Sequence, residues 1–159
     1  MSVVLDPEAD GITHINVWSK GRTDLGRALS NFSHFRFKHP IHGFFASVEG
    51  FWYYVKTGMR HESLRRLHGY AAKAAGSKFE VVMMGEDDFR QLIREAITCK
   101  IEQNVELLDQ VVGNTLPYTH YYVYGAGASA KIVDKPEHAW QLEHIASIGK
   151  KWTKASGAE

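Results

Sequence analysis

Ser47–Lys56, with the sequence SVEGFWYYVK, is the stretch around which the rest of the chain is organised. It contains no proline. Ser47 is a typical N-cap residue, which would place Glu49 in the first helical turn, where the helix dipole favours a carboxylate. Seven residues of an α-helix turn through about 700°, so Glu49 and Lys56 fall within roughly 20° of each other on one face. The stretch therefore predicts a helix with an acid and a base on the same side.

The face between this acid and this base is aromatic. Trp52 and Tyr53 follow Glu49 at the spacings that share a helix face. Glu49 and Lys56 are separated by about 10 Å along the axis, which is too long for an ordinary ion pair and suits the bracketing of a small planar group. The alternative is a solvated helix edge whose aromatic residues belong to the core, and spacing alone favours this alternative. The residues predicted to be buried on the adjoining face are Val48, Phe51 and Val55.

The composition is that of an ordinary globular protein. A chain of 159 residues with 44% hydrophobic and 23% charged residues fits one domain. Its formal net charge of +1 gives no general attraction to nucleic acid or membranes, so such a partner would need a local basic patch. The single cysteine, Cys99, excludes an internal disulfide and fits a reducing compartment. Without an apolar run long enough to span a bilayer or a signal-peptide pattern, we expect a soluble, cytoplasmic protein with no membrane partner.

The hydrophobic pattern predicts an α+β fold: a single, mostly helical domain with a small β-sheet, over residues 11–152. The flanking segments 1–10 and 153–159 are predicted to be flexible. Residues 87–113 form the longest periodic stretch, with Val105 among its inward positions, and predict one long helix or two helices with a kink, capped by Asp87 or Asp88. The other predicted strands are 12–18, 34–39 and 116–124, and the other predicted helices are 61–70, 71–76 and one from about Pro136.

Other chemical motifs are weak. The nine histidines lack the spacing of a metal site, so neither a metal nor a cofactor is expected. The glycine-rich residues 124–131 lack the Gly-Lys-Ser/Thr ending of a phosphate-binding loop and are best interpreted as a turn. A basic group precedes the central helix and either holds a phosphate or nucleic-acid backbone or forms a solvated face balanced by acids. Its members are Lys20, Arg22, Arg27, Arg36 and Lys38.

Several collinear pieces resemble the NADAR (YbiA-like) family. Leu29–Phe32 reads LSNF, Glu49 is followed by aromatic residues and then Lys56, and 96–107 reads AITCKIEQNVEL, similar to that family's A-x-x-x-K-F-x-Q-N-x-x-L helix. Residues 72–77 are a weaker match. The order and spacing agree over roughly residues 28–125. The family's C-terminal D-x-x-W-G element has only Tyr121–Gly125 as a counterpart, without an acid at the matching place.

The resemblance implies an N-glycosidase acting on a ribosylated nitrogen. Glu49 would be the carboxylate that activates water and stabilises the oxocarbenium-like state, and Lys56 would orient it or hold a phosphate or the leaving base. Trp52 and Tyr53 would stack on the base. The sugar side would be lined by Ser30, Asn31 and Phe32, with Arg22 and His120 as further substrate-binding candidates.

Two substrate classes follow from this resemblance, and the basic residues slightly favour the first. These are ADP-ribose on guanine bases of DNA or RNA, and ribosylated intermediates of riboflavin synthesis. A non-catalytic ADP-ribose or nucleotide-binding module, and a purely structural protein, are the rival interpretations. The sequence makes no prediction of the oligomeric state.

Overall fold

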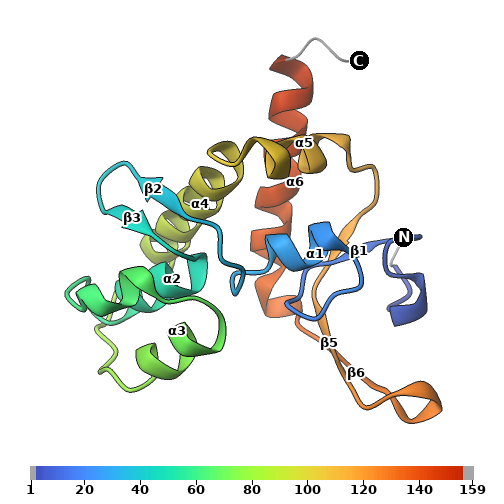
Figure 1. The fold of residues 1–159 in the computed structure, drawn as a ribbon, viewed down its shortest axis with the longest axis horizontal. Helices are drawn as coiled ribbons and strands as arrows, with labels where there is room; N and C mark the ends of the chain where they lie inside the picture. Colours follow the sequence, from blue (N-terminus) through green and yellow to red (C-terminus); the bar gives the residue numbers. More distant parts are fainter. Residues whose placement is uncertain (1–2, 156–159) are drawn as a thin grey trace. The chain divides into compact units, whose positions relative to one another are not determined.

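The computed structural model describes residues 3–155, which form six α-helices and six β-strands (Figure 1). The strands pair into three two-stranded sheets. The predicted α+β class with mostly helical structure is confirmed, but three separate pairs of strands take the place of the one small sheet that was expected. None of the helices in the described part of the chain is long and apolar enough to cross a membrane.

Contacts divide the chain into two compact units. Unit 2 is the continuous segment from Asn31 to Leu108, and unit 1 combines the residues up to Ser30 with those from Asp109 onward. The predicted single domain over 11–152 and the predicted flexible ends stay predictions. Residues 1–2 and 156–159 lie outside the described residues.

Unit 2 is built on α2, Val48–Lys56, the helix predicted from the opening stretch. Ser47 caps it as predicted: its Oγ accepts a hydrogen bond from the Gly50 N–H at 3.0 Å and donates to the Leu67 carbonyl at 2.7 Å. The predicted burial is also confirmed, because Val48, Phe51 and Val55 are at most 1% exposed. Helix α2 packs against α3, Gly69–Gly76, and α4, Glu86–Glu102. The predicted helix over 61–70 is instead a short 3-10 helix, Glu62–Arg66.

A hairpin precedes α2. Its strands β2, Phe37–His39, and β3, Gly43–Phe45, are antiparallel, so the predicted strand 34–39 is shorter than expected and β3 was missed. The fully buried His39 ring explains the turn, because its Nδ1 accepts the N–H groups of Ile41 and His42 at 3.2 and 3.1 Å. Its Nε2 then carries the proton and donates to the Glu95 carboxylate at 2.8 Å.

The long periodic stretch is two helices, α4 and α5, Val105–Gly113, as one of the two predicted alternatives had it. Gln103, at the break, makes two side-chain hydrogen bonds to the backbone of Lys38 at 2.7 and 2.8 Å. The break moves the inward face, so Val105 is 68% exposed and Leu107 is buried, which corrects the prediction for Val105. The cap prediction is also wrong: Gly85 is the N-cap, and the acidic residues fill the first turn.

Unit 1 joins the two ends of the chain through a parallel pair of strands, β1, Ile15–Asn16, and β4, Tyr118–Thr119. The predicted strand 12–18 thus reduces to two paired residues. The predicted strand 116–124 is split into β4 and β5, Tyr121–Tyr124.

Strand β5 forms a hairpin with β6, Lys131–Asp134, which was not predicted. The glycine-rich residues form the connecting turn as expected, with Gly125 at φ 83° and a 3-10 helix at Gly127–Ser129.

Unit 1 also contains two helices, which follow its first and its last strand in sequence. The first, α1, Asp24–Leu29, was missed, and Thr23 caps it by accepting the Gly26 N–H at 2.9 Å. The last, α6, Ala139–Ala155, follows a 3-10 helix, Pro136–His138, and buries Ile145 and Ile148.

Buried polar groups hold the strands of unit 1 together. The Asn16 side chain donates to the Tyr121 carbonyl at 2.9 Å and accepts the Tyr121 N–H at 3.0 Å, while the Asn16 N–H donates to Asp10 Oδ1 at 2.9 Å. The His14 ring lies 2.7 Å from the Tyr121 hydroxyl. Burial, with a smaller contribution from the Asp10 charge, raises the pKa of Tyr121 to about 12, so it stays a neutral hydroxyl. The segment 3–10 is therefore tied to the core through Asp10.

Candidate functional site

The first candidate site of the molecule is the carboxyl group of Glu49, in the first turn of α2. Its backbone N–H donates to the Asn31 carbonyl at 2.9 Å, which joins the loop before the hairpin to the helix start. Burial raises the pKa of Glu49 to about 7, although the charges of Lys73 and Lys56 act to lower it. A carboxyl group with this pKa is present in both protonation states at neutral pH, as a general base or acid requires.

Tyr53 lies beside this carboxyl group. Burial, and then the charge of Glu49, raise the pKa of Tyr53, so its hydroxyl stays protonated. The Lys56 Nζ lies 5.8 Å from the centre of the Tyr53 ring, so the acid, the tyrosine and the lysine belong to one group, as the helical spacing predicted. Gly76 of α3 permits this arrangement: a Cβ there would lie 2.2 Å from the Tyr53 Cγ.

Trp52 takes part in packing. Its ring meets Phe89 of α4 edge to face, with centroids 4.8 Å apart and an interplanar angle of 89°. Phe32 is similarly edge-on to Tyr70, with centroids 6.1 Å apart. The predicted stacking of Trp52 on a base and the predicted contact of Phe32 with a sugar stay predictions.

Residues 31–33, which begin within the LSNF segment, are held within unit 2 by α2, α3 and α4. Loop 31–33 contacts α2 through the Asn31 carbonyl, and the Phe32 carbonyl accepts the N–H of Gly69, the first residue of α3, at 2.9 Å. Lys100 of α4 donates to the Ser33 Oγ at 2.8 Å. Lys100 is only 2% exposed, and burial lowers its pKa to about 7. Lys100 therefore fixes the loop that contacts the helix start at Glu49.

Three predicted site residues, Ser30, Arg22 and His120, belong to unit 1. Ser30 is buried at the end of α1. The guanidinium group of Arg22 is 3.3 Å from the Glu8 carboxylate. The His120 ring lies 2.5 Å from the Val17 carbonyl through Nδ1, and burial lowers the pKa of this histidine. Their predicted contacts with substrate stay predictions.

The predicted basic group does not form one patch within either unit. Lys20, Arg22 and Arg27 lie in unit 1, where Arg27 is ion-paired with Asp24. In unit 2, the Arg36 guanidinium lies 4.0 Å from the centre of the Phe44 ring and the Lys38 Nζ 5.6 Å from it. Within residues 3–155, no three His, Cys, Asp or Glu side chains are grouped so that they could hold a metal ion.

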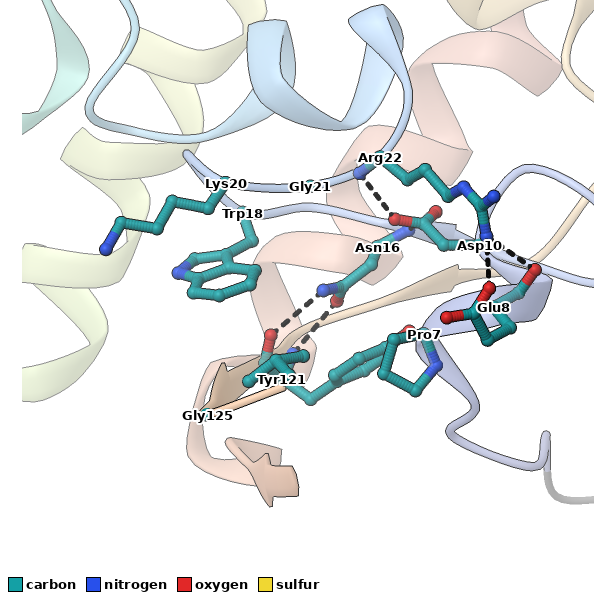
Figure 2. Close-up of a pocket in the computed structure, with 11 residues that line it drawn as sticks. Pro7, Glu8, Asp10, Asn16, Trp18, Lys20, Gly21, Arg22, Tyr121 and Gly125 are labelled. Atoms are coloured by element: carbon teal, nitrogen blue, oxygen red, sulfur yellow. Dashed lines mark hydrogen bonds and ion pairs between the residues drawn. The ribbon is translucent and has the colours of Figure 1, made fainter. Parts of the chain in front are cut away.

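A pocket of about 400 Å³ opens in unit 1 (Figure 2). The side chains that matter for its chemistry are Glu8, Asp10, Asn16, Trp18, Lys20 and Arg22. Both oxygens of the buried Asp10 carboxylate accept backbone N–H groups, from Asn16 at 2.9 Å and Arg22 at 2.8 Å.

Sequence reasoning gave no role to Lys73, Gly76 or Asp10. Lys73 and Gly76 lie in a segment that matched the family only weakly, and their importance depends on the packing of α3 against α2. The lysine at the middle of an alanine-rich helix and the glycine at its last position were visible signals, but neither indicated which helix would lie opposite. Asp10 lies in a segment that was predicted to be flexible.

Comparison with known proteins extends the fold assignment. No family model matches the chain, and no curated protein matches it either. The NMR structure of the E. coli protein YbiA is similar in fold, with a TM-score of 0.67 over 92% of this chain and 89% of that chain, at 18% sequence identity. At this identity the likeness shows the fold, so the predicted YbiA-like α+β architecture is confirmed.

Proposed function

We propose that the protein is an N-glycosidase that removes ADP-ribose from guanine bases in nucleic acid, with Glu49 as its catalytic carboxyl group. The observation that carries this proposal is a partly buried carboxyl group with a pKa of about 7, beside Tyr53 and two lysines. The YbiA-like fold and the motif resemblance support the reaction class.

The reaction proceeds by breaking the bond between the anomeric carbon of the ribose and the base nitrogen. The bonding electrons pass to the base, which takes up a proton, and the sugar develops oxocarbenium character that the ionised Glu49 stabilises. Glu49 also accepts a proton from the water that attacks the anomeric carbon. The products are free ADP-ribose and the restored base.

The neighbouring side chains have separate roles. Lys56 and Lys73 favour the ionised form of Glu49 and balance its charge. Tyr53, which stays protonated, offers a hydroxyl donor beside the carboxylate. The hydrogen bond from the Glu49 N–H to the Asn31 carbonyl holds this loop against the helix start, which supports the proposed role of Asn31 in lining the substrate.

The test is release of free ADP-ribose from a DNA oligonucleotide ADP-ribosylated on guanine. We expect turnover by the wild type and a loss of at least about 100-fold in Glu49→Gln, the order expected for a general base. Glu86→Gln is the matched control, because Glu86 is also a first-turn glutamate and its side chain is 70% exposed. This control should keep full activity.

Other outcomes lead to other conclusions. Equal rates in the wild type and Glu49→Gln would remove Glu49 from the reaction. If no ADP-ribose is released from the oligonucleotide but ribosylated riboflavin-pathway intermediates are hydrolysed, the substrates are these small molecules. No hydrolysis of either, with ADP-ribose still bound, would indicate a binding module.

A further inference from the structure

We propose that Tyr70, in the first turn of α3, is a specificity residue of the Glu49 site and stacks on the base that the reaction releases. The inference rests on the proposed function and deepens it, because it assigns to Tyr70 a contact with the leaving base. All the residues that carry it belong to unit 2.

The aromatic rings of α2 nearest to Glu49 are engaged by neighbouring helices. The Trp52 ring meets Phe89 of α4 edge to face, with centroids 4.8 Å apart. The Tyr53 ring is packed against Gly76 of α3. Helix α3, which lies against α2, is the element that presents an open aromatic ring (Figure 1).

Tyr70 occupies the same place in α3 as Glu49 does in α2, since each is the second residue of its helix. Consecutive carbonyl groups of one loop hold the two helix starts together. The Asn31 carbonyl accepts the Glu49 N–H at 2.9 Å. The Phe32 carbonyl accepts the N–H of Gly69, the residue before Tyr70, at 2.9 Å. The tyrosine therefore stands beside the helix start that carries the acid.

The Tyr70 side chain is open to solvent but has neighbours that orient it. It is 76% exposed, and the Phe32 ring meets it edge to face, with centroids 6.1 Å apart and an interplanar angle of 79°. These contacts leave most of the ring surface uncovered. A base can stack on such a ring without sequence-specific hydrogen bonds.

Lys73 connects this ring with the acid. Its Nζ lies 6.0 Å from the centre of the Tyr70 ring. Of the two lysines that favour the ionised form of Glu49, Lys73 acts more strongly. One ammonium group is thus close to the tyrosine ring and within electrostatic reach of the carboxyl group.

The chemistry of the substrate identifies the base that Tyr70 meets. Glu49 acts at the anomeric carbon, to which the leaving base is bonded directly. The adenine of ADP-ribose is separated from that carbon by two ribose rings and two phosphates. Tyr70, which one lysine side chain joins to Glu49, is therefore assigned to the leaving base and not to the adenine.

The first test is steady-state hydrolysis of the guanine-ADP-ribosylated oligonucleotide. We expect Tyr70→Leu to raise KM about tenfold and to leave kcat unchanged, because stacking is present both before and during bond cleavage. Tyr70→Phe keeps the ring and should match the wild type. Phe44→Leu is the matched control and should change neither constant, because it removes a 48% exposed ring of unit 2 that lies on the β2–β3 hairpin.

Binding measurements separate this inference from the proposed hydrolysis. Glu49→Gln and the double variant Glu49→Gln/Tyr70→Leu are titrated with ADP-ribosylated guanosine and with free ADP-ribose. Loss of the Tyr70 ring should weaken ADP-ribosylated guanosine about tenfold and leave ADP-ribose unchanged, because only the first ligand carries the guanine. If the wild type hydrolyses nothing and this difference is still found, the proposed function fails and the stacking role of Tyr70 stands.

Three results would overturn the assignment of Tyr70. The first is an unchanged KM together with an unchanged affinity for ADP-ribosylated guanosine after loss of the ring. The second is equal weakening of ADP-ribosylated guanosine and ADP-ribose, which would place Tyr70 at the adenine end. The third is a fall in kcat with KM unchanged, which would mean that Tyr70 supports the position of α3 and does not hold the base.

Discussion

Glu49 and Glu86 occupy the same position in their helices, the first turn, but differ in their surroundings. Glu86 is exposed and ion-paired with Arg90 at 2.8 Å, whereas Glu49 is partly buried among α2 and α3. Burial opposes the charged form of Glu49 more strongly than Lys73 and Lys56 favour it. At the scale of one residue, the site is therefore a carboxyl group whose ionisation opposes folding.

This opposition predicts a pH-dependent stability. Glu49 ionises near 4.5 in the unfolded chain and at about 7 in the folded one. Between these values the folded state binds more protons, so stability falls as the pH rises through this window. Glu49→Gln removes the effect and should be more stable than the wild type by about 3 kcal/mol at about pH 8.

Urea unfolding of the wild type and Glu49→Gln at about pH 8 and about pH 4 measures this difference. It should disappear at the lower pH, where the glutamate is protonated in both states. A difference of the same size at both pH values would instead mean that the amide alters packing, and would contradict the raised pKa.

Helix α3 is the element that completes the site, and its closest approach to α2 is at Gly76. A side chain there would overlap the Tyr53 ring, because its Cβ would lie 2.2 Å from Cγ. We expect Gly76→Ala to destabilise the fold by about 1–3 kcal/mol and to reduce ADP-ribose release, because Tyr53 or α3 must move. Thermal unfolding and the hydrolase assay together measure the two effects.

Gly113→Ala is the control for this prediction. Gly113 is also at the last position of a helix, α5, and a Cβ there would meet nothing within 4 Å. Gly113→Ala should change the free energy of unfolding by no more than about 0.5 kcal/mol and leave ADP-ribose release unchanged. If both glycine variants behaved alike, the contact between Gly76 and Tyr53 would not be important.

The elements also show which features the sequence could predict. The bounds of α2 and the burial of its apolar face followed from helical periodicity and from Ser47, since these are local. Helix α1 was missed because its periodic pattern is too short. The hairpin β2–β3 depends on His39, and β1 on Asn16, through buried hydrogen bonds to distant residues that no local pattern reports.

The candidate site was predictable to a similar extent. Helical spacing placed Glu49, Tyr53 and Lys56 together, because all three lie on one helix. The contribution of Lys73 depends on tertiary packing, and so does the involvement of Lys100 with loop 31–33. These contacts could be found only once α3 and α4 were placed on α2.

At the scale of the whole molecule, each of the two units has its own buried core. Ile148 of α6 is 3% exposed in unit 1, and Ile93 of α4 is 0% exposed in unit 2. Truncating either to alanine should destabilise the protein by about 2–5 kcal/mol, because each leaves a cavity. Native-state hydrogen exchange should then lose protection first in the unit that carries the substitution.

The two variants should lose hydrogen-exchange protection in different units. Ile148→Ala should expose amides of residues 3–30 and 109–155, and Ile93→Ala those of residues 31–108. Equal loss of protection throughout the chain in both variants would show that the two units unfold as one.

The pairing of β1 with β4 has a consequence for synthesis of the chain. A ribosome completes Asn16 well before its partner Thr119, whereas residues 31–108 already contain the core of unit 2. Unit 2 can therefore fold as it emerges. Ile15 and Val17, which are buried in the folded protein, stay exposed until β4 has been synthesised and pairs with β1. A pause in translation beyond residue 108 would lengthen this interval, and during it a chaperone would bind the exposed apolar residues around Ile15 and Val17.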